Sequence, residues 1–317
     1  MTVRRVLLGL VGHALALGAC GGESTSDPSA PAATPVTAFD AGAASAEADA
    51  AASTCPTAGA AESTSPLASA AITEPSGIAA SRLNPGVFWV HNDSGDSARA
   101  FAVDRTGALL TTLVFDTAPA VDIEDMAIED APDGSSYLYF ADIGDNAGAR
   151  SDYLVHRVRE PRVGAEASIT TVSEKMTVRY PDGSHDAETL LFDPRTKDLF
   201  IVTKIGFGRA AIHRVGPFVA GGTATTTRIA GVSLALATGG AISRDGSLIA
   251  IRSYTSSASL WRRAPGEDLV AVFARAACKV PIAAETQGEA FAFLVDGSGY
   301  VTVSEGAQQP LHVSRFQ

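Results

Sequence analysis

Five segments of the chain begin with a residue that carries an oxygen donor, and three of these residues are glutamates. The five are Ser76, Glu124, Glu188, Thr238 and Glu289, and successive positions lie 48, 64, 50 and 51 residues apart by subtraction. If a repeat fold brings them together, like charges raise the carboxyl pKa values or require a cation. Carboxylate and hydroxyl oxygens are hard ligands that suit Ca²⁺. The pattern predicts an axial calcium site; the alternative is a metal-free acidic surface neutralised by Lys204, Arg252 and water.

More polar residues follow the second apolar stretch of most repeats or precede the first. The segments His91–Asp96 and Asp142–Asn146 share an Asp-x-Gly-Asp pattern. We expect this side of the fold to form a ligand face. Its predicted members are Asp96, Asp142, Asp145, Asp186, Tyr254 and Glu305.

The same residues admit a catalytic hypothesis, in which calcium assists hydrolysis of a phosphate or another ester. His91 or the carboxylate of Asp93 would act as general base, and Lys204 and Arg252 would hold a phosphate. The structural alternative is a hydrogen-bonded loop histidine together with cations paired to Asp93 or Asp142. Whether the protein is an enzyme stays open at this point. A glycosidase is a third hypothesis, but few aromatic residues are placed to stack on sugars.

These residues need a scaffold of short strands separated by turns. After residue 66 the sequence consists of β-rich runs divided by Gly, Asp, Pro and Ser, and a four-stranded propeller blade repeats every ~40–50 residues. We predict an all-β, five-bladed β-propeller, with six blades as the alternative. The last repeat has three strands, 290–294, 299–304 and 311–316, so we expect segment 67–73 to supply the fourth.

The N-terminus resembles a bacterial lipoprotein signal. Arg4 and Arg5 precede an apolar run that ends in Leu17-Gly18-Ala19-Cys20, and this run is too short to span a bilayer. The resemblance implies a signal peptide over 1–19 and a lipidated Cys20. Residues 20–66, rich in Ala, Ser, Thr and Pro, would form a tether, and 67–317 the propeller. We expect a lipid-anchored protein of the cell envelope, on the outer membrane if the host has one.

With Cys20 assigned to lipid, Cys55 and Cys278 remain. Exported proteins keep disulfides, so we predict a bond between these two. Cys278 precedes the last repeat and Cys55 precedes the strand expected to complete it. Such a bond would fasten the closure of the ring.

The residue series from Ser76 to Glu289 resembles that of calcium-dependent apyrases. Those are five-bladed propellers in which each blade supplies a hydroxyl or glutamate to an axial calcium ion, so the resemblance implies Ca²⁺ as the cofactor. The blade order also resembles SdiA-regulated lipoproteins and phytase-esterase-like propellers. The basic residues with which apyrases hold nucleotides are not evident here. The resemblance therefore supports a calcium site more strongly than it supports nucleotide hydrolysis.

The net charge of −11 argues against nucleic acid as a partner. We expect a monomer whose ligand is a small molecule, a glycan or a protein. Trp89 and Trp261 fall within predicted strands, so we expect both to pack in the core.

Overall fold

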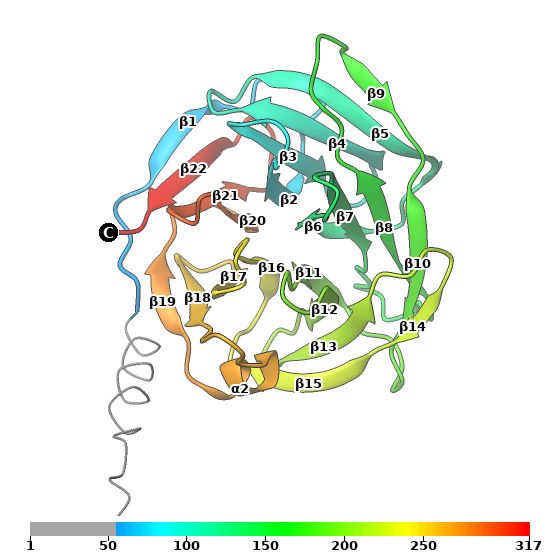
Figure 1. Cartoon of the computed structure of the whole chain (residues 1–317), viewed down its shortest axis with the longest axis vertical. Coiled ribbons are helices and arrows are strands. Elements are labelled where there is room, and N and C mark those ends of the chain that lie inside the picture. Colours follow the sequence, from blue (N-terminus) through cyan, green and yellow to red (C-terminus); the bar gives the residue numbers. More distant parts are fainter. Residues whose placement is uncertain (1–54) are drawn as a thin grey trace, which may run out of the picture. The chain divides into compact units, whose positions relative to one another are not determined.

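The structure is a computed structural model that describes residues 55–317. In Figure 1 five sheets surround a central channel, each with its first strand nearest the axis. The predicted five-bladed propeller is therefore confirmed, and the six-bladed alternative is wrong. The predicted signal peptide, Cys20 and the tether up to residue 54 lie outside the described residues. Within residues 55–317, no helix is long and apolar enough to cross a membrane.

The blades follow the chain, and each runs from the axis outward. Blade one contains β2 (Pro75–Ala80), β3 (Val87–Asn92), β4 (Ser97–Asp104) and β5 (Leu109–Pro119). Blade two contains β6 (Ile123–Asp130), β7 (Ser136–Asp142), β8 (Tyr153–Arg159) and β10 (Glu174–Arg179). Blade three contains β11 (Ala187–Phe192), β12 (Asp198–Thr203), β13 (Ala210–Pro217) and β15 (Thr227–Val232). Blade four contains β16 (Ala237–Ile242), β17 (Leu248–Ser253), β18 (Ser257–Arg262) and β19 (Cys278–Pro281).

Two blades gain a fifth strand from the blade that follows them. β9 (Ser168–Thr170) leaves blade two and pairs in parallel with β5, and β14 (Thr223–Thr225) leaves blade three and pairs in parallel with β10. The long spacing between Glu124 and Glu188 thus contains an addition to the rim of blade one. It contains no sixth blade.

Blade five contains β20 (Gly288–Phe293), β21 (Gly299–Ser304) and β22 (Pro310–Arg315), and its outermost strand comes from the other end of the described chain. That strand is β1 (Glu62–Pro66), antiparallel to β22, rather than the predicted segment 67–73. The prediction favoured the more apolar segment, but Leu67 and Ile72 are fully buried in the core between blades one and five. The polar sequence of β1 suits an edge strand, because its side chains remain largely exposed while its backbone pairs.

A disulfide joins Cys55 to Cys278, as predicted. Their Cα atoms are 5.5 Å apart across a sequence separation of 223. Cys278 opens β19 in blade four, whereas the chain just after Cys55 runs beside the end of blade five, where Ala58 bridges to Phe316. The bond therefore links the closing segment to the neighbouring blade.

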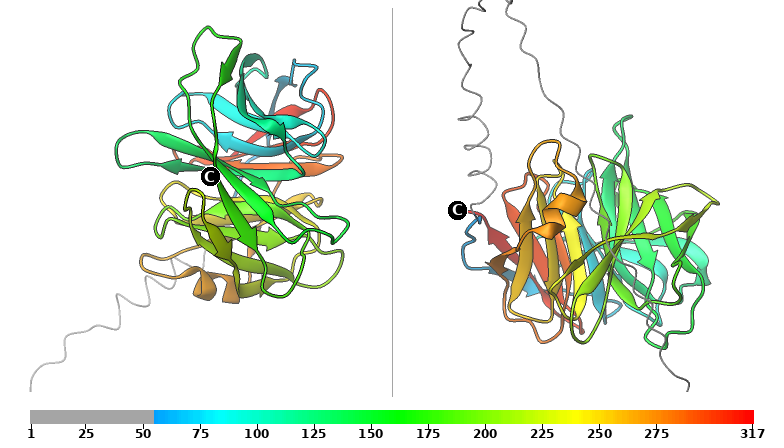
Figure 2. Two further views of the ribbon diagram at one scale, coloured as in Figure 1. Left: turned by 90° about the vertical axis from the view of Figure 1, so that its right-hand side faces the viewer. Right: turned by 90° about the horizontal axis from the view of Figure 1, so that it is seen from below.

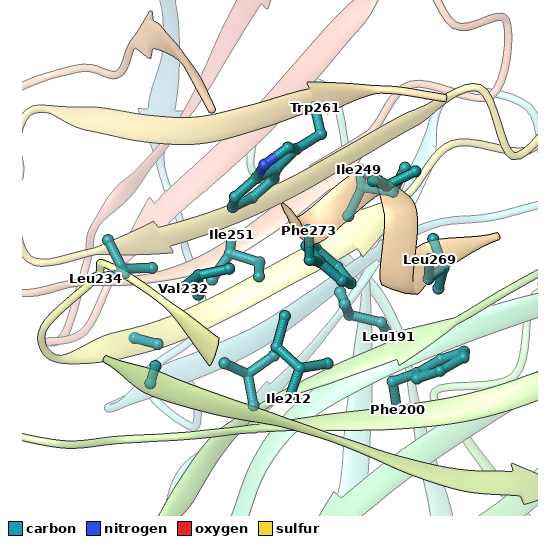
Figure 3. Packing of buried hydrophobic residues seen from close by; sticks show 14 of the residues in the cluster. Leu191, Phe200, Ile212, Val232, Leu234, Ile249, Ile251, Trp261, Leu269 and Phe273 are labelled. Carbon is teal, nitrogen blue, oxygen red and sulfur yellow. The ribbon is translucent and has the colours of Figure 1, made fainter. Parts of the chain in front are cut away.

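Apolar side chains between adjacent blades form the core. Figure 3 shows the contact of blades three and four, where Trp261 packs edge-on against Phe273 of α2 (Leu269–Ala274) at 5.2 Å between ring centroids. The side views of Figure 2 show this helix, in orange, at the rim. Trp89 is fully buried and Trp261 is 4% exposed, so both predictions for the tryptophans are confirmed.

Candidate metal centre

Each of the five inner strands has a β-bulge near its start, and the bulged residue is the one singled out in the sequence. In β2, Pro75 pairs with Asn92 and Gly77 with His91, which leaves Ser76 without a cross-strand partner. The same offset occurs in the other four inner strands, at Glu124, Glu188, Thr238 and Glu289. A bulge re-aims the extra side chain. The five positions are therefore structurally equivalent and define one end of the channel, called here the acidic end.

The two hydroxyl-bearing members of this ring connect neighbouring blades. Ser76 Oγ donates to the Glu124 carbonyl oxygen at 2.5 Å, and Thr238 Oγ1 donates to the Gly288 carbonyl oxygen at 2.8 Å. Both side chains are almost completely buried. Their protons are thus committed to the backbone of the next inner strand, and only their oxygen lone pairs remain for a ligand.

The glutamates of blades three and five lie beside Lys204 and Tyr254. Lys204 Nζ donates to Glu188 Oε1 and, at 3.1 Å, to the Tyr254 hydroxyl oxygen. Glu188 Oε2 is buried without a hydrogen-bond partner among the described residues. Burial, with Glu188 nearby, raises the pKa of Glu289 to about 9. This half of the ring is partly neutralised by one lysine and still holds an unsatisfied oxygen.

The most compact carboxylate group lies on the other side of the channel, at Asp93, Asp122 and Glu124. One oxygen from each lies within 4.8 Å of the others. Asp93 Oδ1 is buried and has no hydrogen-bond partner in the described part of the chain. Gly144 lies against this group, since a Cβ there would collide with Glu124 Oε1 and Asp122 Oδ2. Of the five predicted metal ligands, only Glu124 belongs to this cluster.

The electrostatic cost of the cluster appears in its pKa values. Burial, with Asp93 nearby, raises the pKa of Asp122 to about 6. Burial also raises the pKa of Asp93, and burial followed by the charge of Glu188 raises that of Glu124. Carboxyl groups in this position either keep protons or share a cation.

Two of the predicted catalytic residues are removed from the surface. His91 lies on β3, fully buried against Gly77, with Nδ1 2.8 Å from the Asn92 carbonyl oxygen. Burial lowers its pKa to about 4, so it is a neutral structural histidine in a strand rather than in a loop. Arg252 is 1% exposed and forms an ion pair with Glu285 at 2.7 Å, so it cannot grip a phosphate at the channel mouth.

The predicted ligand face divides into two groups. Asp96, Asp142 and Asp145 shape loops: Asp96 binds Arg99, Asp142 accepts from the Val121 amide, and Asp145 accepts from the Ala149 amide. Asp186 accepts from the Asp145 amide at 2.9 Å. Tyr254 is held by Lys204, and Glu305 is half-buried with a pKa raised by burial. Burial, followed by the charge of Glu289, raises the pKa of Tyr254, so Tyr254 lies near that glutamate of the ring.

The repeated Asp-x-Gly-Asp pattern is out of structural register. The residue equivalent to Asp142 is Asn92, and not Asp93. The side chains of Asn92 and Asp142 both accept hydrogen bonds from the backbone amides two and three positions before the bulged residue of the neighbouring inner strand. Asp93 is therefore free of the capping role that saturates Asp142. This difference is why Asp93 is available to the carboxylate cluster.

A residue that the sequence analysis did not single out connects three of the inner strands. Asp125 is fully buried, and its carboxylate accepts from the amides of Met126 at 2.8 Å, Leu190 at 2.9 Å and Gly240 at 3.3 Å. It thus ties together the inner strands of blades two, three and four. One feature of the sequence could have identified Asp125. It directly follows Glu124, at a position where the alternation of the strand predicts an apolar or small residue.

The sequence matches no described protein family and no curated protein. Among solved structures, the chain is similar to one described as the crystal structure of RRP9 WD40 repeats. The two share 9% sequence identity with a TM-score of 0.42, over 81% of this chain and 100% of that one. A structure of U3-55K shares 10% identity with a TM-score of 0.41, over 82% of this chain and 99% of the other. Neither likeness bears on a ligand or an activity.

Proposed function

We propose that this protein is a calcium-binding propeller, and that Asp93, Asp122 and Glu124 hold the ion at the acidic end of the channel. The observation that carries the proposal is the spacing of these three carboxylates, within 4.8 Å, together with the buried unpartnered oxygen of Asp93. Oxygens about 2.3–2.6 Å from a Ca²⁺ ion span roughly this distance across it. The ring hydroxyls of Ser76 and Thr238, and the carboxylates of Glu188 and Glu289, would then form a surrounding shell instead of the predicted first set of ligands.

The chemistry of the donors favours calcium over softer metals. All three proposed ligands are carboxylates, and hard oxygen ligands suit Ca²⁺ or Mg²⁺ rather than Zn²⁺ or copper. Mg²⁺ demands near-ideal octahedral geometry and retains its waters, whereas Ca²⁺ tolerates irregular sets. The cluster takes its members from two blades and a connecting loop, which is an irregular arrangement.

Calorimetric titration of the full-length, metal-free protein with Ca²⁺ tests this proposal. We expect saturable binding of one ion, weakened at least tenfold in Asp122→Asn and Glu124→Gln. Asp182→Asn is the matched control, because Asp182 is an exposed carboxylate that bonds to His185 outside the cluster. If wild type shows no saturable signal, or if the cluster variants bind as wild type does, the metal assignment fails.

With calcium bound, the acidic end would present a cation beside Tyr254 and Lys204 to a ligand such as a glycan, a phosphate ester or a protein. Binding is favoured over ester hydrolysis because the predicted base His91 and the predicted phosphate clamp Arg252 are both buried. Of the predicted catalytic residues, Asp93 and Lys204 remain at the site. Assays of the calcium-loaded protein with aryl phosphates and aryl esters separate the two, and turnover lost in Asp93→Asn would favour the hydrolase.

We further propose that the propeller is held at the cell envelope through lipid on Cys20. The support is the sequence Leu17-Gly18-Ala19-Cys20 after a short apolar run, and the Cys55–Cys278 disulfide fits an oxidising compartment. Fractionation of cells that express wild type or Cys20→Ser tests the anchor. The wild-type protein should sediment with membranes, and the variant should not.

A further inference from the structure

The end of the propeller opposite the acidic end carries a basic cavity of about 350 Å³ between blades five and one. The turns that join inner and second strands lie at this end, which is called here the turn end. The cavity is lined by backbone and side chains of the 81–87 and 294–296 segments together with Arg82, Arg105, Arg244 and Arg315. Four arginines around one cavity are unexpected in a chain with a net charge of −11.

The charges of these arginines are only partly neutralised. Arg82 and Arg244 share one carboxylate, that of Asp130, at 3.3 Å and 2.8 Å. Arg315 lies 3.8 Å from Asp296, and both side chains are more than half exposed. Exposed ion pairs of this kind contribute little binding free energy, so Arg315 remains available to a ligand.

Arg82 and Arg105 keep N–H groups without a hydrogen-bond acceptor in the region that the structure describes. The Arg82 side chain is 8% exposed and its buried Nε makes no hydrogen bond. Arg105 is exposed and has no acidic partner within residues 55–317, and its side chain lies over Gly86, where a Cβ would come within 3.3 Å of Arg105 Nε. A buried N–H group without an acceptor, such as Arg82 Nε, costs free energy, and an anion in the cavity would supply that acceptor.

The rest of the cavity wall is apolar. Pro85, Val87, Phe88, Leu294 and Val295 line it. A second cavity of about 180 Å³ adjoins it and shares Phe88, Arg105, Leu294 and Arg315 before continuing along β1 and β22. Cavities that bind small molecules have this size and this mixture of apolar wall with a few charged groups.

We propose that the turn end binds a small organic anion, with a carboxylate or phosphate head between Arg82, Arg105 and Arg315 and an apolar body along Phe88 and Leu294. Guanidinium forks match both kinds of head. This site is independent of the calcium site, which lies beyond Asp125 at the other end of the channel.

Titrations of the full-length protein, followed by NMR or calorimetry, test the proposal with hexanoate, hexyl phosphate, inorganic phosphate, acetate and hexanol. We expect hexanoate or hexyl phosphate to bind, and acetate or inorganic phosphate, which lack the apolar body, to bind at least tenfold more weakly. The comparison of hexanoate with hexyl phosphate identifies the preferred head. Hexanol, which lacks the charge, should bind least.

Arg105→Glu and Arg315→Glu should each weaken binding of the better anion at least tenfold. Arg159→Glu is the matched control, since Arg159 is exposed, lies near Asp133 and lines neither cavity. Melting curves establish that each variant is folded. Equal affinity for hexanol and hexanoate, unchanged binding in both arginine variants, or no binding of any probe would overturn the proposal. Repeating the titrations in calcium and in chelator keeps this result separate from the fate of the calcium proposal.

Discussion

The same five inner strands make both ends of the central channel, yet the ends have opposite chemistry. At the acidic end each strand has a bulge, and three of the five bulged residues are glutamates. Toward the turn end the strands pair regularly, and residues such as Ile78, Met126 and Phe192 surround a space of only about 30 Å³. That space accommodates about one water molecule. A one-residue offset at the strand start thus separates a polar ring from a packed barrel wall.

The comparison predicts that the residues between the ring and the turn end determine stability, whereas the ring residues determine calcium binding. The boundary is Asp125, whose carboxylate serves amides of three blades. Variants on each side of this boundary should therefore have different effects. The four predictions below run from the largest expected effect to the smallest.

Replacement of Asp125 should have the largest effect. Asp125→Ala leaves the amides of Leu190 and Gly240 buried without acceptors, and we expect a loss of roughly 3 kcal/mol in the free energy of unfolding. Chemical denaturation of the metal-free protein measures this loss. Glu124→Gln, one residue away in the ring, should leave stability unchanged or raise it, because the amide is uncharged at every pH and needs no proton to be buried. If the two variants lose equal free energy of unfolding, Asp125 does not separate the stabilising residues from the ring.

Calcium should produce the next largest effect. At a concentration one hundred times the dissociation constant, a ligand of the folded state adds about 2.7 kcal/mol. For a domain of this size that corresponds to a rise of roughly 5–10 °C in melting temperature. Gly144→Ala should remove the rise, since its methyl group would displace the oxygens of Glu124 and Asp122. Gly134→Ala, in a turn at the turn end, is the control. It should keep the calcium-dependent rise in melting temperature.

The pH dependence of the metal-free protein should be smaller but should point in one direction. The pKa of Glu289 is about 9, against an ordinary value of 4.5, so the folded chain keeps a proton that the unfolded chain releases. Its contribution to stability is complete below pH 4.5 and is lost as the pH rises to about 9. Melting temperatures of wild type should therefore fall relative to those of Glu289→Gln across this range. A constant difference between the two would contradict the raised pKa.

Changes in the turns of the turn end should have the smallest effect. Asp296 caps its own turn by accepting from the Ser298 amide at 3.0 Å, and its side chain is 66% exposed. Asp296→Asn retains an acceptor and should change stability by less than about 0.5 kcal/mol. Calcium titration of this variant should match wild type, and a weakened affinity would show that the two ends are coupled.

The blades could be predicted from sequence because each depends on local alternation and turns. The positions of the bulged residues were also readable, since a polar residue at each strand start breaks an otherwise apolar run. The additions of β9 and β14 could not be read, because short polar strands that pair in parallel with a distant blade leave no periodic signal. The choice of β1 over segment 67–73 also depended on tertiary packing of Leu67 and Ile72.

The site was predicted less completely than the fold. Repeat position identified Glu124 but could not show that Lys204 neutralises Glu188, or that Arg252 turns away to Glu285. Asp93 was misaligned with Asp142 because their sequence patterns agree while their backbone registers differ by one. Distances between side chains from different blades decide the ligand set, and these distances are not periodic in the sequence.

The pairing of β1 with β22 has a consequence for assembly. The two strands that complete the ring lie at opposite ends of the described chain, so a nascent molecule cannot finish its last blade until its final strand has been synthesised. Without β1, the outer edge of β22 would offer unpaired backbone groups to any extended segment, including β1 of a second copy. At high concentration we therefore expect exchanged dimers, in which β1 of each copy pairs with β22 of the other. The ring of five blades would then be closed by a strand from a second molecule instead of by a strand of the same chain.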